Sequence, residues 1–274
     1  MSAAAPLPED GPGWYLYGVA AAEEAPTARL ESATAVDPQH PVALVVEGTL
    51  AGVTSRVSLE EFDEAALPQR LGDAAWVEQK VRAHEQVLEG VLEAASVVPC
   101  RFCTVYRTEA ELRSFLAERN EELTRALARV AGRVELGVKA FVDRDRFAAG
   151  NNAVRELAER VSQAEGGRAY LESRRLDQLV GQELAHFGAE VASALDERLR
   201  AVAEDGVLVG LQRPEVSGRE EEMVFNGAYL VSEKPRFEQE LATLAADFRG
   251  NGVELELTGP WPPYNFVPAK LGEP

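Results

Sequence analysis

Alternation of apolar and polar side chains predicts the clearest strands of this chain. Val253, Leu255 and Leu257 alternate with two glutamates, which predicts a strand with one apolar and one charged face. The same alternation over 134–142 predicts a second strand with a regular pattern. Further strands are predicted at 14–20, 42–47, 50–58, 97–106, 207–211 and 223–231. The strands 42–47 and 50–58 are expected to form a hairpin that turns near Gly48.

A period close to 3.6 residues predicts the helices. The helix 73–95 has an apolar stripe that includes His84, whereas Lys80 lies off that stripe. A capping box at Thr108 begins another helix, which ends at Gly132. The remaining predicted helices are a short piece at 28–34, a helix at 152–163, a long helix at 169–203 of about 50 Å, and a last helix that begins at Pro235 and ends before Gly250.

The order of these elements predicts an α+β fold. Strand, helix, two strands, helix and strand follow one another in the first half, and the second half repeats this order with an added helix. We therefore expect two tandem ferredoxin-like (βαββαβ) domains with helices on one face of each antiparallel sheet. The expected segments are a disordered N-terminus 1–13, a ferredoxin-like domain 14–107, a connecting helix 108–132, a modified ferredoxin-like domain 133–258 and a tail 259–274.

The tail combines proline with aromatic residues. A turn is expected at 258–260, and prolines at 260, 262 and 263 exclude both a helix and a central strand, which leaves an extended segment. That segment carries Trp261, Tyr264 and Phe266. A stiff aromatic tail loses little entropy when it docks, so it either clamps the protein's own core or binds a partner. These three aromatic residues are the candidates for partner binding.

Two smaller features of the pattern leave their interpretation open. Gly181 and Gly188 lie seven residues apart on the long helix, where they either permit close approach of another backbone or have no packing role. The charged run 143–146 follows a strand and is typical of a solvated turn, with a small charged hinge or ion-pair network as the alternative.

Charge restricts the classes of partner. The 274 residues include 46 acidic and 28 basic side chains, for a net charge of −18, which would repel nucleic acid and anionic lipid surfaces. No apolar run approaches the roughly 20 residues that span a bilayer, and the first residues lack the pattern of a secretory signal. We therefore expect a cytoplasmic protein that binds neither nucleic acid nor a membrane.

Chemistry-bearing residues are few. Cys100 and Cys103 have the C-x-x-C spacing, but on the predicted strand 97–106 their side chains would point to opposite faces, so we expect neither a metal nor a disulfide. His84 lies on an apolar helix stripe, which is typical of a hydrogen-bonded interface histidine. No nucleophile, phosphate-binding or zinc motif occurs in the sequence. We expect no catalytic, cofactor-binding or metal-binding residues, and hence not an enzyme.

The chain resembles a known family in seven segments that follow one another along almost its whole length. The segments are 15–19 (YLYGV), 83–88 (AHEQVL), 97–106 (VVPCRFCTVY), 135–139 (ELGVK), 167–171 (GRAYL), 226–231 (NGAYLV) and 257–266 (LTGPWPPYNF). In these it is similar to the gas vesicle protein F/L family (GvpF/GvpL). It departs from the family pattern at Cys103, where that pattern has glycine, and at Cys100, where the family often has an apolar residue.

The resemblance implies a function as well as a fold. It implies two α+β domains of ferredoxin-like character in a non-enzymatic minor gas vesicle component, which is cytoplasmic and associated with gas vesicles. Such a protein binds the main shell protein GvpA and limits its aggregation while a vesicle nucleates, with other gas vesicle accessory proteins as further candidate partners. The alternative is a small-molecule-binding or enzymatic ferredoxin-like protein. A deep apolar pocket with convergent polar groups would favour that alternative, and a broad exposed apolar patch would favour a protein partner.

Overall fold

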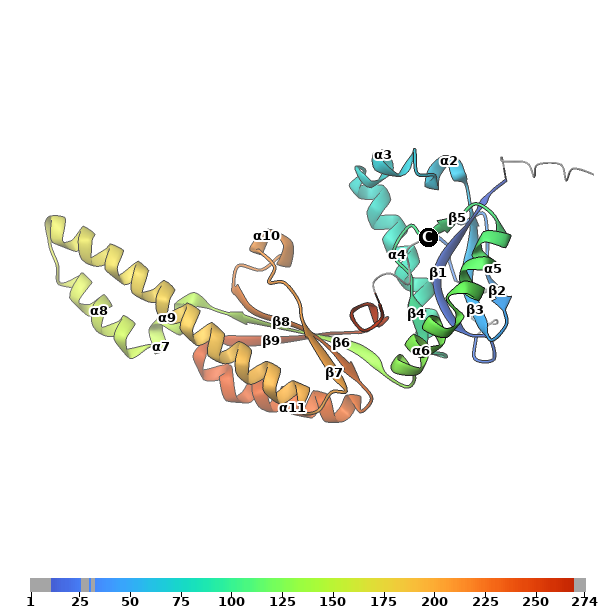
Figure 1. Ribbon diagram of the computed structural model, residues 1–274. Helices are drawn as coiled ribbons and strands as arrows, with labels where there is room; N and C mark the ends of the chain where they lie inside the picture. Colours follow the sequence, from blue (N-terminus) through green and yellow to red (C-terminus); the bar gives the residue numbers. More distant parts are fainter. Residues whose placement is uncertain (1–10, 26–29, 31–32, 269–274) are drawn as a thin grey trace, which may run out of the picture. The chain divides into compact units, whose positions relative to one another are not determined.

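The computed structural model describes residues 11–25, 30 and 33–268, and these form two compact units (Figure 1). The first unit contains Met1–Arg133 and Trp261–Pro274, and the second contains Val134–Pro260. The predicted helix at 28–34 and the predicted disordered segment 1–13 lie largely outside the described residues. Gly13 already belongs to the first strand.

The first unit is built on a sheet whose strands follow the order β2-β3-β1-β4, with β5 also paired to β1. Its strands are β1 (Gly13–Ala21), β2 (Val42–Glu47), β3 (Leu50–Val57), β4 (Val97–Pro99) and β5 (Val105–Tyr106). The predicted hairpin is confirmed, because β2 and β3 pair antiparallel from Val42 opposite Ser55 to Glu47 opposite Leu50. Gly48, in the turn, has a positive φ of 58°, which glycine adopts without steric cost.

Helices cover both faces of this first sheet. They are α2 (Leu59–Phe62), α3 (Leu67–Leu71), α4 (Ala74–Leu92), α5 (Glu109–Glu118) and α6 (Asn120–Val130). On one face, Leu88 and Val91 of α4 pack with Tyr15 and Tyr17 of β1. On the other face, leucines of α5 and α6 pack with Leu16. The expectation of helices on one face only is therefore wrong for this unit, and β1 reads as a continuous apolar run because both of its faces are buried.

Two sequence predictions in the first unit need correction. The strand expected over 97–106 is two short strands, because the chain turns at 100–104, where the Thr104 amide donates to the Arg101 carbonyl at 3.2 Å. The connecting helix expected over 108–132 is α5 and α6 with a break at Arg119, and this break lets leucines of both helices reach the sheet. The capping box is present, since Thr108 and Glu111 each accept from the other's backbone amide.

The second unit has a sheet in the order β7-β8-β6-β9. The bounds of its strands are β6 (Val134–Val142), β7 (Asp205–Leu208), β8 (Glu222–Val231) and β9 (Val253–Trp261). Counted within each unit, both sheets therefore place their strands in the order second, third, first, fourth. Strand β9 runs through the turn that the sequence predicted at 258–260, so that prediction is wrong, and the strand expected at 207–211 ends at Leu208.

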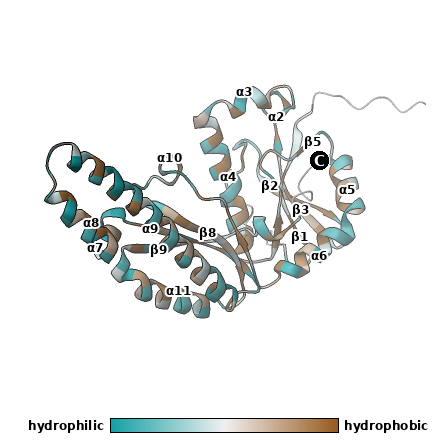
Figure 2. Ribbon diagram, turned by 60° about the vertical axis from the view of Figure 1, so that its left-hand side comes forward, coloured by the Kyte–Doolittle hydropathy of each residue, from teal (hydrophilic) through white to brown (hydrophobic). Residues whose placement is uncertain are grey.

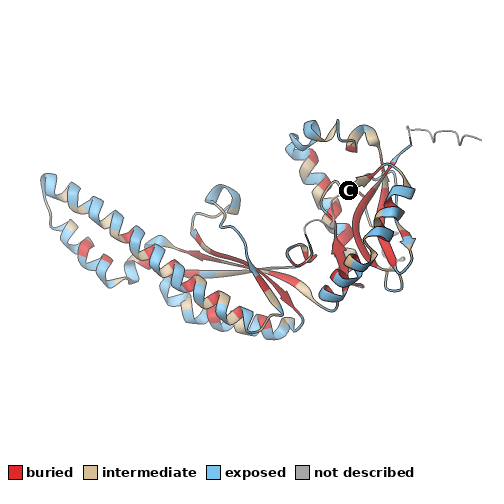
Figure 3. Cartoon of the chain, in the orientation of Figure 1, coloured by how far each residue is buried: buried red, intermediate tan, exposed pale blue. Residues whose placement is uncertain are grey.

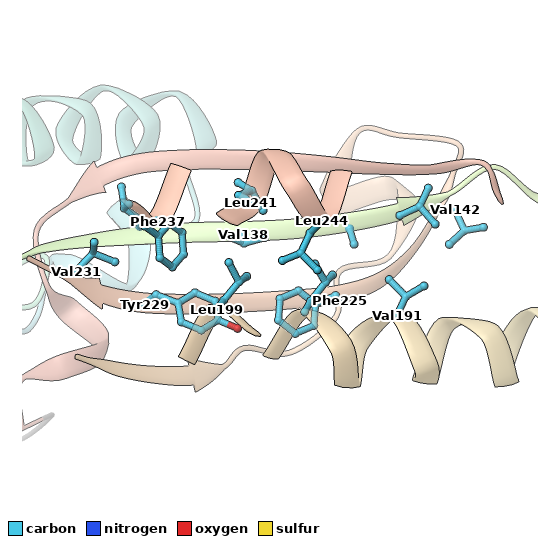
Figure 4. Packing of buried hydrophobic residues seen from close by; sticks show 14 of the residues in the cluster. Val138, Val142, Val191, Leu199, Phe225, Tyr229, Val231, Phe237, Leu241 and Leu244 are labelled. Carbon is cyan, nitrogen blue, oxygen red and sulfur yellow. The ribbon is translucent and has the colours of Figure 1, made fainter. Parts of the chain in front are cut away.

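Helices α9 and α11 pack on one face of the second sheet. The helices of this unit are α7 (Arg144–Gly150), α8 (Asn152–Ser162), α9 (Gly166–Arg200), α10 (Pro214–Ser217) and α11 (Lys234–Phe248). Val191 and Leu199 of α9 and Leu244 of α11 meet Phe225 and Tyr229 of β8 in one core (Figure 4). The N-terminal part of α9 extends beyond the sheet beside α8 (Figure 1). The run 143–146, expected as a turn, is instead the N-cap and first turn of α7.

Burial follows the amphipathic pattern that the sequence predicts. Strands β1, β3, β6 and β8 are largely buried, whereas the outward sides of α8, α9 and α11 are exposed (Figure 3) and carry the hydrophilic residues of those helices (Figure 2). Both sheets are antiparallel wherever their pairing is described. The chain is thus a mixed helix and sheet protein, and its description as two tandem ferredoxin-like domains stays a prediction.

Candidate functional site

The aromatic tail is anchored on helix α4 within the first unit. The Tyr264 hydroxyl donates to Glu85 Oε1 at 3.0 Å and lies 3.0 Å from His84 Nε2. Tyr264 begins a short 3-10 helix, Tyr264–Phe266, and the Phe266 ring is only 3% exposed. Trp261 is 39% exposed. Tyr264 and Phe266 therefore contact the protein's own body, and Trp261 is the one of the three that is exposed.

His84 joins the tail to the sheet. Its Nδ1 lies 2.9 Å from the Tyr15 hydroxyl of β1, and the Cys103 amide donates to that hydroxyl at 3.0 Å. One arrangement of protons satisfies the whole series: Tyr15 donates to Nδ1, and Nε2–H donates to Tyr264. A strand, a turn, a helix and the tail thus share one hydrogen-bonded series, which we call the tail anchor and define as Tyr15, His84, Glu85, Cys103 and Tyr264.

Burial governs the electrostatics of the tail anchor. It lowers the pKa of His84 to about 4, so the imidazole is neutral at neutral pH. Burial also raises the pKa of Glu85 and raises that of Tyr15 well above its ordinary value. Both imidazole nitrogens are hydrogen-bonded, so the prediction of a hydrogen-bonded histidine at this position is confirmed.

Lys80 is a residue of this region whose position the sequence analysis missed. It is buried on the same side of α4 as His84, where its Nζ donates to the Val36 carbonyl at 2.8 Å and lies 3.2 Å from Glu61 Oε1. The prediction that Lys80 lies off the stripe is wrong. The available signal was its spacing of four residues from both Trp76 and His84, which puts all three on one helix face.

The two cysteines lie in different layers of the first unit. Cys100 is in the cluster formed with α5 and α6, and Cys103 packs against the cluster formed with α4. The predicted reason for their separation, an unbroken strand, is wrong because the chain turns between them. Both thiols are free, and burial raises the pKa of each to about 12, so both are protonated at neutral pH.

An exposed apolar segment lies in the second unit, at the edge of the sheet. Ten large hydrophobic residues of the described chain are exposed, and five of them fall within residues 207–216. They are Val207, Leu208, Val209, Leu211 and Val216. We call residues 207–216 the apolar segment. Sequence reasoning placed a strand here but could not show that it is an edge strand.

A mainly apolar hollow in the first unit has a volume of about 570 Å³. Its walls are mainly small apolar groups of the β1 end and α6, including Ala21, Leu127 and Ala128. The polar residues in its lining are Glu23, Glu24, Thr49, Ser96 and Thr124, and the lining includes no histidine, cysteine or lysine.

No three or more His, Cys, Asp or Glu side chains within the described part of the chain are grouped as a metal ion would require. Among the same residues, no helix has both the length and the apolar character needed to cross a membrane.

The chain matches known proteins over most of its length. The family model described as gas vesicle synthesis protein GvpL/GvpF matches residues 13–268. Gas vesicle protein L of Streptomyces sp. (strain CB03234) is 34% identical over 83% of this chain and 84% of its own. Gas vesicle protein F of the same strain is 30% identical over 92% of this chain and 98% of its own.

Solved structures show the same fold. The crystal structure of the gas vesicle protein GvpF from Anabaena sp. PCC7120 has a TM-score of 0.66 at 19% identity and covers 94% of this chain and 96% of its own. GvpF from Microcystis aeruginosa has a TM-score of 0.62 at 19% identity and covers 93% and 98%. From the family match and these relatives, we conclude that the chain belongs to the gas vesicle synthesis protein GvpL/GvpF family.

Proposed function

We propose that this protein is a non-enzymatic, cytoplasmic accessory component that binds the main gas vesicle shell protein GvpA and limits its aggregation while a vesicle forms. Membership of the GvpL/GvpF family supports a role in gas vesicles. A wall that faces gas on one side requires a strongly apolar subunit, and such a subunit would self-associate in water before assembly.

The observation that carries this proposal is the apolar segment. Scattered exposed hydrophobic residues are ordinary in soluble proteins, but here five fall within ten consecutive residues, which makes this segment the candidate contact region. By contrast, the 570 Å³ hollow is lined largely by small apolar groups and includes no histidine, cysteine or lysine. The arrangement favours a protein partner over a small molecule.

The net charge of −18 suits the same role. A complex that carries this excess charge repels other copies of itself, so shell protein held by this chain would stay dispersed. The contact should be only moderately tight, since the shell protein has to leave for the growing wall.

Light scattering by the shell protein on dilution from denaturant tests the proposal. We expect this protein at matched concentration to suppress the scattering and to co-elute with the shell protein in gel filtration. Leu211→Asp, at a residue 60% exposed in the apolar segment, should weaken suppression. Leu71→Asp, at a residue 51% exposed on α3 of the first unit, adds the same charge and should leave suppression unchanged. Scattering that is unaffected by the wild-type protein over a wide ratio would contradict the proposal.

Trp261 remains a candidate for a second contact, as the exposed member of the aromatic tail. Trp261→Ala should reduce co-elution with the shell protein while shifting the melting temperature little. Phe266→Ala, in contrast, should lower the melting temperature clearly, because a buried ring contributes about 3 kcal/mol or more. If Trp261→Ala lowers the melting temperature and the protein still co-elutes with the shell protein, the Trp261 ring holds the tail on the first unit and is not a contact for the partner.

We also infer that the two units are related ferredoxin-like sandwiches. The support is their common strand order, second, third, first, fourth, with an additional helical layer in the first unit. Superposition of the two units in an experimental structure, with equivalent strands aligned, would test this.

A further inference from the structure

We propose that the free edge of strand β7 binds the shell protein by strand addition, taking one extended apolar segment that is flanked by basic residues. This rests on the function proposed above and names the surface and the chemistry of its partner. In strand addition the partner's backbone bonds to the edge strand, and its side chains alternate between the two faces of the extended sheet.

The strand order leaves one side of β7 without a neighbour among the described residues. β7 is at the end of the order β7-β8-β6-β9 and pairs only with β8 on that path, from Asp205 opposite Leu230 to Leu208 opposite Gly227. An end strand presents backbone groups that no sheet neighbour satisfies.

The register shows which backbone groups face outward. The Val209 amide donates to the Asn226 carbonyl at 2.8 Å, so residues 209 and 226 lie on the hydrogen-bonded rungs of the ladder. Since these rungs alternate in an antiparallel pair, Leu208 and Gly206 direct their N–H and C=O groups away from β8. The Gly206 amide donates to the Asp205 side chain at 2.8 Å, as expected for an amide outside the ladder. Leu208, which is 59% exposed, is therefore the centre of the proposed site.

Beyond Asp205, with which β7 begins, this edge lacks the charged and proline residues that usually prevent strand pairing. Residues 206–212 read GVLVGLQ and contain no charge and no proline. The strand at the other end of the sheet, β9, carries Glu254, Glu256 and Pro260, which are typical protecting residues. Within one sheet, therefore, one edge is protected and the other is open and apolar.

Charge indicates which occupant fits the edge. Residues 204–222, which contain the edge and its flanks, have six acidic and two basic side chains. A second copy of this chain would bring the same acidic flanks and its own net charge of −18. An apolar strand flanked by lysine or arginine would instead be attracted at both ends. We therefore assign the edge to such a strand of the shell protein.

The test separates a backbone contact from a side-chain contact at one residue. Leu208→Pro removes the outward amide without removing a bond to β8, which is the position where an edge strand tolerates proline. Leu208→Ala removes the side chain and keeps the amide. We expect the proline variant to lose at least tenfold in affinity for the shell protein in gel filtration, and the alanine variant to lose less than threefold. Circular dichroism and melting temperature of both variants establish that they fold.

Two further measurements keep the proposal testable if the proline variant does not fold, and they test the preference for a partner with basic flanks. Leu208→Lys places a protecting charge at the edge and should weaken binding like proline does. A synthetic strand of alternating valine and threonine should bind the wild-type protein at least tenfold more tightly with lysine flanks than with glutamate flanks.

Each contrary outcome has a distinct meaning. Equal losses for Leu208→Pro and Leu208→Ala would overturn strand addition in favour of a side-chain patch. If no Leu208 variant loses affinity while the wild type still suppresses scattering, the edge of β7 is not the binding site, and the proposed function still holds. If the wild type does not suppress scattering by the shell protein, the proposed function itself is contradicted. A wild-type dimer that Leu208→Pro dissociates would assign the edge to a second copy.

Discussion

A single imidazole illustrates how individual residues hold the C-terminal tail. His84 lies between the hydroxyls of Tyr15 and Tyr264, and both bonds suit a neutral ring. Protonation would turn the nitrogen that accepts from Tyr15 into a donor and would place a charge in a buried environment. Burial therefore gives the ring a pKa of about 4, below its ordinary value of 6.5.

The first prediction is a pH dependence of stability that originates in His84. The folded-state pKa is below the unfolded one, so the unfolded chain binds more protons between pH 4 and pH 6.5. The contribution of His84 to stability is full above pH 6.5 and is lost as the pH falls toward 4. Lowering the pH from 7.5 to 5 should cost about 2 kcal/mol more in the wild type than in His84→Gln, which keeps a donor and an acceptor but does not titrate.

Urea unfolding followed by tryptophan fluorescence measures this difference, because all three tryptophans, Trp14, Trp76 and Trp261, belong to the first unit. Glu85 gives a pH dependence of stability with the opposite sign. Burial raises its pKa, so its contribution to stability falls as the pH rises past the ordinary value of 4.5. Glu85 is present in both proteins, so it largely cancels from the comparison. Identical pH dependence in wild type and variant would contradict the role assigned to His84.

The backbone conformation at Cys103 gives a physical reason why glycine would suit that position. Its φ is 66°, the left-handed region, and it is the one non-glycine residue with a positive φ in the described chain. An L side chain in this region costs roughly 1–2 kcal/mol, and a β-branched one is a rarer exception.

The second prediction follows from this backbone conformation. Cys103→Gly should leave the free energy of unfolding within about 1 kcal/mol of wild type, since relief of strain offsets the greater freedom of the unfolded chain. Cys103→Val should lower it by more than about 1 kcal/mol, although valine is larger and more apolar. Urea denaturation of the two variants provides the comparison, and a valine variant as stable as the glycine variant would contradict it.

At the scale of the element, helix α9 shows which of its two glycines, Gly181 or Gly188, has a packing role. A Cβ at Gly188 would lie 2.9 Å from Val224 Cγ1, so this glycine allows α9 to approach β8 closely. Gly181 has nothing within 4 Å of the same position. Packing therefore requires glycine at position 188 but not at position 181. The sequence could not show this difference, because the residue type is the same at both positions.

The third prediction uses these two glycines as a matched pair. Gly181→Ala should stabilise the protein by about 0.5–1 kcal/mol, because alanine has the better helix propensity and meets no neighbour. Gly188→Ala gains the same propensity but forces α9 away from a stiff β-branched side chain, and should destabilise by about 1–3 kcal/mol. Thermal unfolding monitored by circular dichroism at 222 nm distinguishes them, and a stabilising Gly188→Ala would show that Val224 moves aside freely.

At the scale of the whole molecule, the apolar segment and the net charge of −18 have separate roles in the proposed function. Contact with the shell protein is attributed mainly to apolar surface and backbone pairing, which salt affects little, and in smaller part to the attraction of basic flanks, which salt weakens. Dispersal of the complex is attributed to repulsion between charges, which salt screens, with a Debye length of about 14 Å at 50 mM and 4 Å at 500 mM.

The fourth prediction is that salt separates these two roles. Raising the salt concentration from about 50 to 500 mM should increase light scattering by the complex, whereas the shell protein should still co-elute with this chain. The shell protein alone at both salt concentrations is the control. Loss of co-elution before any rise in scattering would mean that charge, and not apolar contact, holds the partner.

Much of the local structure and the family could be predicted from the sequence. The hairpin of β2 and β3, the capping box of α5 and strand β6 each follow from contacts between residues close in the chain or from a regular alternation. The hydrogen-bonded nature of His84 followed from its place on an apolar stripe. The family followed from short segments in order along the chain.

Other features depended on contacts between distant residues, so no local pattern could determine them. Residues 97–106 are strand-forming throughout, yet only pairing with β1 decides that the middle turns and that Cys103 adopts a positive φ. The spacing of Lys80 from Trp76 and His84 indicated its helix face, but the groups that satisfy its ammonium could not be predicted, because Val36 and Glu61 come from other segments.

Local pattern by itself determined which residues form strands and helices, because alternation and helical periodicity are properties of neighbouring residues. Tertiary structure alone decided which strand lies at an edge and which aromatic residue of the tail is covered. Val207 and Leu208 have the same apolar character as buried strand residues, and only the strand order leaves them exposed. Tyr264 is an anchor because residues 84 and 85, some 180 positions earlier in the chain, supply its hydrogen-bond partners.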